Sequence, residues 1–152
     1  MDRADAPTLA LSTVHVDAAR LRQLLVFERT LRSLAPVGCS AEQTARAHAA
    51  AVAASGLVAS EVEAPLALLR RFASNRSLCA TLAKHLAQIE ASGAQDAARR
   101  EQVGELHRRL AALEQALRAR EDPVTLRVLD AHAPEILALF ASSGDGFAPP
   151  RQ

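Results

Sequence analysis

The feature that most constrains the fold of this sequence is an apolar seam between residues 94 and 121. Its members are separated by alternating steps of three and four residues, and they are Val103, Leu106, Leu110, Leu113 and Leu117. This spacing is the pattern of packed helices, whereas side chains along a strand alternate with a period of two. At about 1.5 Å per residue, the segment predicts one long amphipathic helix of roughly 40 Å.

Composition extends the helical prediction to the whole chain. The sequence contains 34 Ala and 22 Leu among its 152 residues, and both residue types are strong helix formers. Trp and Tyr are absent and Phe occurs four times, so we expect an aliphatic core with close contacts between helices. No segment alternates β-branched and polar residues as strands do. We therefore predict an all-α fold: a single compact bundle of five or six helices with one long amphipathic helix.

Capping residues predict several helix boundaries in the first half of the chain. Asp17 is expected to cap a helix that ends before Pro36. Ser40 and Gln43 form a capping box, so an Ala-rich helix should begin there. Gly56 is expected to end that helix in a left-handed conformation, which glycine adopts without steric cost.

Proline and polar residues divide the second half of the chain. Pro65 predicts a short turn and then a new helix. Ser74-Asn75 predicts a break, after which a helix over residues 76–91 is expected to bury Leu78, Leu82, Leu86 and Ile89. Asp122-Pro123 predicts a cap and a restart, and Pro134 is expected to kink or split the last helical region.

Length and charge limit the class of the protein. The chain fits one helical domain over residues 1–152, with loosely ordered arms at about 1–12 and 144–152. Its formal net charge of +1 offers no basic excess for non-specific binding of nucleic acid. We find neither a long uncharged apolar segment nor a secretory signal pattern. We therefore expect a cytoplasmic protein that binds neither nucleic acid nor membranes.

Glu28 is the most unusual candidate site residue. On a helical wheel it falls in the middle of an apolar stripe formed by Leu21, Leu24, Leu25 and Leu31. A carboxylate is rarely buried unless it is paired, and Arg32, one turn further on, is the expected partner. A second interpretation makes Glu28 a ligand or an acid in a cavity of the bundle. A third is that the stripe is set differently and Glu28 faces solvent.

The histidines and cysteines show no recognised metal spacing. His48 lies on the apolar side of the Ala-rich helix, and His85 borders the apolar stripe of residues 76–91. No pair of Glu-x-x-His motifs of the di-iron type occurs, and Cys39 and Cys79 match no metal or redox motif. We therefore predict no metal and no other cofactor. The alternative function is a bundle that binds a small molecule or metal through Glu28, Arg32, His48 and His85.

The sequence favours a non-enzymatic protein and leaves open, as a weaker alternative, an enzyme whose site has no sequence signature. It contains no phosphate-binding glycine loop and no Gly-x-Ser-x-Gly elbow. The apolar seam fits two interpretations, which are packing inside the bundle and docking of a partner helix or of a second copy. Our leading hypothesis is an interaction or adaptor protein that binds a protein partner or itself. The partner-binding residues would be Val103, Leu106, Leu110, Leu113 and Leu117.

Overall fold

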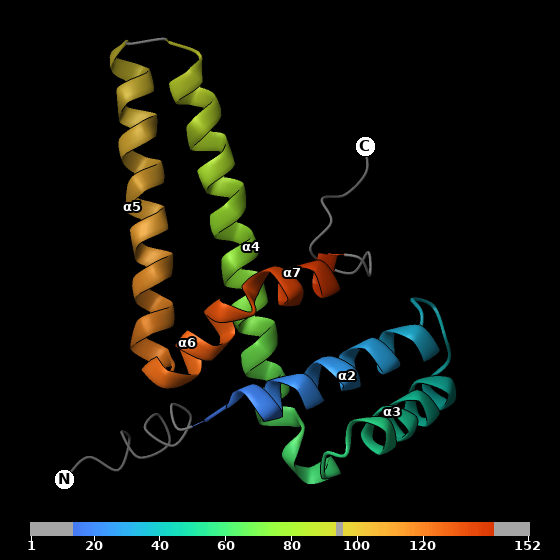
Figure 1. The fold of residues 1–152 in the computed structure, drawn as a ribbon. Helices are drawn as coiled ribbons and strands as arrows, with labels where there is room; N and C mark the ends of the chain where they lie inside the picture. The colour runs from blue at the N-terminus through green and yellow to red at the C-terminus, as the bar shows by residue number, and fades with distance from the viewer. Residues whose placement is uncertain (1–13, 94–95, 142–152) are drawn as a thin grey trace, which may run out of the picture.

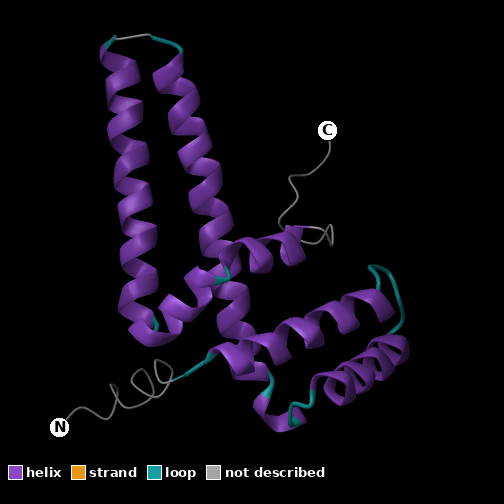
Figure 2. Ribbon diagram, viewed as in Figure 1, coloured by secondary structure: helices purple, strands orange, loops and turns teal. Residues whose placement is uncertain are grey.

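A computed structural model describes residues 14–93 and 96–141, which form helices joined by short loops (Figure 1). The elements are α2 (Ala18–Leu34), α3 (Ala41–Ser55), the 3-10 helix η1 (Ala59–Glu61), α4 (Glu63–Ala91), α5 (Ala97–Arg120), α6 (Pro123–Ala131) and α7 (Ala133–Ala141). These described residues contain no strand (Figure 2). The predicted all-α bundle is therefore confirmed. The arms predicted at about 1–12 and 144–152 lie outside the described residues.

Local capping interactions set the predicted boundaries of α2 and α3. The Asp17 carboxylate accepts a hydrogen bond from the backbone N–H of Arg20 at 2.7 Å. Ser40 and Gln43 form the reciprocal capping box, with distances of 2.8 and 3.1 Å. Gly56 follows α3 with a φ of 73°, in the left-handed region. These interactions satisfy backbone groups that the helix ends would otherwise leave unpaired.

The predicted divisions of the second half are confirmed at three of four places. The turn η1 precedes α4, as Pro65 indicates. Asp122 caps α6, with Pro123 at the first helical position, and the chain is divided between α6 and α7 at His132, before Pro134.

The predicted break at Ser74-Asn75 is wrong. α4 runs without interruption from Glu63 to Ala91, so this 29-residue helix, and not the 24-residue α5, is the longest of the described helices. The Asn75 side-chain amide donates a hydrogen bond to the backbone carbonyl of Leu113 at 3.0 Å. This partner in α5 removes the competition of Asn75 with its own helical backbone, and the remaining propensity cost is below about 1 kcal/mol.

A sharp bend separates α3 from α4. The axes of residues 41–55 and 59–91 differ in direction by 94°, and η1 lies between them. The bend leaves α3 packed alongside α2 (Figure 1). Among the described residues no single helix has both the length and the apolar character to cross a membrane. The segments 41–55 and 59–91 have the length and the apolar composition of a membrane span only when they are taken together.

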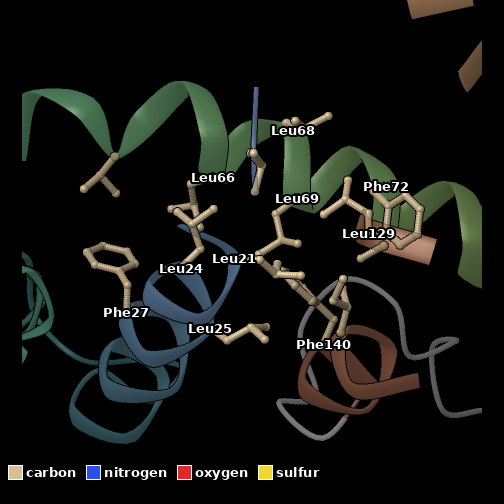
Figure 3. Packing of buried hydrophobic residues seen from close by; sticks show 14 of the residues in the cluster. Leu21, Leu24, Leu25, Phe27, Leu66, Leu68, Leu69, Phe72, Leu129 and Phe140 are labelled. Carbon is tan, nitrogen blue, oxygen red and sulfur yellow. The ribbon is translucent and has the colours of Figure 1, made fainter. Parts of the chain in front are cut away.

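The main core forms around the first half of α4. Figure 3 shows Leu66 and Leu69 of α4 facing Leu21 and Leu24 of α2. The other large buried side chains of this core include Leu25, Phe27, Val62, Leu68, Phe72, Leu117, Leu129, Ile136 and Phe140. Because α2, α4, α6 and α7 all contribute, this core fixes the direction in which α4 leaves it.

The second half of α4 and most of α5 project from the main core as an antiparallel hairpin (Figure 1). We call residues 74–91 and 97–113 the arm. Its buried side chains, Leu86, Ile89 and Leu106, pack with the partly buried Leu82, Val103 and Leu110. Leu78 was expected to be buried, but it is 48% exposed. The expectation is wrong because α5 covers only one side of α4 here.

Candidate functional site

Glu28 forms a buried ion pair that joins two helices. Its side chain is 1% exposed, and its carboxylate accepts hydrogen bonds from Arg32 Nε at 2.9 Å and from an Arg70 guanidinium nitrogen at 3.0 Å. The Arg32 guanidinium also lies 4.6 Å from the ring centroid of Phe140 in α7, within cation–π range. The predicted Arg32 partner is confirmed. Arg70 was missed because it lies 42 residues away, where no local spacing indicates it.

The pairing accounts for the burial of Glu28. Each carboxylate oxygen already accepts a hydrogen bond from an arginine, and the two arginines come from α2 and α4. A buried charge with such partners is typical of a structural ion pair, and removal of one partner from such a pair is strongly destabilising. The position therefore links α2 to α4, and Phe140 extends the contact to α7.

The structure does not bring together the four residues of the alternative ligand site. The His48 ring packs edge-on against Phe27, with centroids 5.3 Å apart. His85 lies 15 residues beyond Arg70 in the continuous α4, which places it about 22 Å along the helix from the residue that contacts Glu28. Direct metal ligands lie about 2 Å from the ion. The described residues contain no cluster of three or more His, Cys, Asp or Glu suited to a metal.

Both cysteines are free thiols. Cys39 Sγ lies 3.1 Å from Thr44 Oγ1, beside the start of α3. Cys79 lies in α4 with its Sγ 3.7 Å from Asn75 Oδ1. Burial raises the pKa of the Cys79 thiol. Because the thiolate is the reactive form, Cys79 lacks the activation that a nucleophilic cysteine needs at neutral pH.

A second group of ion pairs fixes the base of the arm. The Arg76 guanidinium donates hydrogen bonds to Glu114 of α5 and to both carboxylate oxygens of Asp130 of α6, the latter at 3.1 and 3.0 Å. It also lies 5.4 Å from the ring centroid of Phe72. Nearer the main core, Arg71 holds the buried Glu121 at 3.0 Å. These contacts tie α4 to α5 and α6 where the arm begins.

The charged side chains of this group shift each other's pKa. Burial disfavours the charged form of Arg76, but the hydrogen bond and charge of Glu114 and the charge of Asp130 outweigh it and raise the pKa of Arg76. The hydrogen bond from Arg76 lowers the pKa of Glu114. Both groups therefore stay charged at neutral pH.

The apolar seam of α5 packs largely on α4 of the same chain. Leu106 is buried in the arm, with Val103 and Leu110 packed around it. Leu117 belongs to the main core, and Leu113 is half-buried. The seam residues therefore make intramolecular contacts along much of their length.

One apolar face of α4 is only partly covered in the arm: Leu78 is 48% exposed, Leu82 is partly buried, and Ile89 is buried against α5. Leu78, Leu82, His85 and Ile89 follow one another in steps of four, three and four residues, so they share one face of the helix. Sequence analysis missed the exposure of Leu78 because it depends on how far α5 covers α4, which the spacing of residues along α4 does not record.

An open groove of about 680 Å³ runs beside this face in the outer part of the arm. We call it the arm groove; among its lining residues are His85 and Ile89 of α4 and Glu101, Glu105, Arg108 and Arg109 of α5. Hydrogen bonds from Arg108 and Arg109, at 2.9 and 3.2 Å, lower the pKa of Glu105. The groove thus combines an apolar wall with carboxylates and guanidinium groups.

Replacement of Glu28 with Gln should destabilise the fold. The amide keeps the shape of the side chain but removes the charge that two arginines require, so we expect a loss of about 2–4 kcal/mol in the free energy of unfolding. Urea unfolding followed by circular dichroism measures it. The matched control is Glu42→Gln, which removes an exposed i,i+4 pair with Arg46 and should cost at most about 0.5 kcal/mol. Equal effects of the two variants would contradict a structural role for Glu28.

Replacement of Glu114 with Gln should change how stability depends on pH. The folded pKa of Glu114 lies below its unfolded value, so its stabilising contribution is present above about pH 4.5 and is lost as the pH falls through the folded pKa. We expect the variant to be about 1 kcal/mol less stable at pH 7 and the difference to shrink toward pH 3. Urea unfolding at both pH values tests this, with Glu63→Gln as the unpaired control. A difference that stays constant with pH would be the contrary result.

Comparison of the chain with protein-family models, curated proteins and solved structures finds no significant match. What the protein does is therefore inferred from its own geometry. That geometry consists of a bundle held by buried ion pairs and of an arm whose apolar face is only partly covered.

Proposed function

We propose that the protein is a non-enzymatic interaction or adaptor protein that binds a partner helix, or a second copy of itself, through the arm. The observation that carries this proposal is the partly covered apolar face of α4, where Leu78 is 48% exposed. Leu82, which is partly buried, lies one turn further along the same face, whereas Ile89 is buried against α5. Apolar anchors one and two turns apart are the means by which amphipathic helices dock on each other.

The seam of α5 has a supporting part in this proposal. Val103, Leu106 and Leu110 hold α5 against α4, so they keep the binding face of α4 ordered. Leu113 is half-buried beside Asn75 and extends the apolar area at the base of the arm. The predicted partner-binding residues of the arm thus contribute mainly by holding α5 in place, and the exposed anchor is Leu78, next to the partly buried Leu82.

The rigid attachment of the arm favours binding. α4 enters the main core without a hinge, and Arg76 fixes α5 and α6 at the point where the arm leaves it. A surface that is already ordered loses little conformational entropy when a partner binds. The arm therefore presents its anchors in a fixed geometry, as helix-in-groove docking requires.

Replacement of Leu78 with Asp should abolish binding and leave the fold intact. The side chain is already half exposed, so we expect a change of at most about 1 kcal/mol in the free energy of unfolding. The test is quantitative capture from a lysate of the source cells by the tagged full-length chain, with thermal unfolding measured in parallel. Wild type should retain a defined protein, its own copy included, at least tenfold more than the variant does.

The matched control for this experiment is Val58→Asp. Val58 is 58% exposed and lies before η1, outside the arm. Its replacement with Asp therefore adds the same charge at a distant apolar site. It should capture as much as wild type. The proposal is wrong if folded Leu78→Asp captures as much as wild type, or if both variants lose binding equally.

A further inference from the structure

We infer that the partner of the arm is the arm of a second copy of this chain, arranged antiparallel with a two-fold axis near Glu105. The inference rests on the proposed function and names the occupant of its binding face. Three features of the arm favour it: the order of charges along α5, the length of the arm, and the exposure of Leu78.

The charges along the arm groove are self-complementary. Glu101 and Glu105 precede Arg108 and Arg109 along α5, and all four line the groove. An antiparallel second copy places Glu101 opposite Arg109 of the partner, whereas a parallel copy places like charges together. An interface formed by the same surface of two copies pairs residues in this reciprocal way.

The two carboxylates nearest the axis do not oppose this arrangement. Each Glu105 already accepts hydrogen bonds from Arg108 and Arg109 of its own chain, at 2.9 and 3.2 Å. These contacts offset its charge before association. The Glu101 carboxylate, in contrast, forms no ion pair within the described part of its own chain, so it is available to an arginine of the second copy.

The length of the arm fits the same axis. The part of α5 in the arm spans residues 97–113, about 24 Å at 1.5 Å per residue, and its centre is residue 105. Two arms that overlap about this centre cover each other over their full free length. Each tip then ends short of the partner's main core, to which α5 contributes Leu117. The sign change of the charges and the middle of the arm thus coincide.

A second arm also covers the apolar side chains that the first leaves exposed. The arm has a small buried cluster of its own, and Leu78 lies outside it at 48% exposure. Two antiparallel hairpins form a four-helix bundle, in which such side chains become core positions. Leu78 and Leu82 of each copy would then pack against the outer half of the partner's arm.

A charge-exchange experiment on the purified full-length chain tests this inference. One variant combines Glu101→Arg with Glu105→Arg, and the other combines Arg108→Glu with Arg109→Glu. Sedimentation velocity and native mass spectrometry, from about 1 to 100 µM, give the dimer affinity. We expect wild type to dimerise, each variant alone to lose at least tenfold in affinity, and an equimolar mixture to form the heterodimer. Circular dichroism verifies the helix content, and Glu42→Arg on α3 is the control outside the arm.

The outcomes separate the inference from the proposed function. Recovery of affinity on mixing cannot come from misfolded variants, so it places these charges in the interface. The loss of affinity in each variant alone supports the antiparallel pairing, because a parallel copy opposes like charges in the wild type and in the variants alike. The inference would be overturned by a dimer whose affinity does not change in these variants, or by variants whose affinity does not recover on mixing. A chain that stays at 16.1 kDa throughout overturns it as well. If the chain is monomeric but captures a different protein in a Leu78-dependent way, the proposed function still holds. If it captures no protein, the inference and the proposed function are both wrong.

Discussion

The packing of the first half of α4 in the main core determines the geometry of the rest of the protein. Leu69 and Phe72 lie among side chains from α2, α6 and α7, and burial of such residues contributes about 2 kcal/mol each. Because α4 continues without a break, the core that fixes its first half also fixes the direction of its second. The arm is thus a rigid extension of the core, and its apolar face keeps a constant position relative to the bundle.

Three arginines of α4 connect this helix to its neighbours. Arg70 contacts Glu28 of α2, Arg71 contacts the buried Glu121 after α5, and Arg76 contacts α5 and α6. The planar guanidinium group donates several hydrogen bonds in fixed directions, so one side chain can hold two acids. In a core without Trp or Tyr, these ion pairs supply the directional contacts that aliphatic packing lacks. They stabilise the bundle and place the start of the arm.

The parts of the structure that sequence analysis predicted depend on contacts within about four residues. The capping box at Ser40 and the left-handed Gly56 are of this kind, and so is the pair of Glu28 with Arg32. The parts that it missed depend on distant partners. Asn75 is helical because a carbonyl 38 residues away accepts its hydrogen bond. The exposure of Leu78 depends on how many helices surround the arm, which no local pattern records.

We propose that the arm, which lies outside the main core, is covered when the protein associates. Hydrogen–deuterium exchange of the wild-type chain at low and high concentration tests both parts in one measurement. In dilute protein, amides of residues 82–91 and 97–110 should exchange faster than those of residues 66–73. At high concentration, exchange in the arm should slow and exchange in the core should stay the same. Equal protection of arm and core at both concentrations would contradict the account.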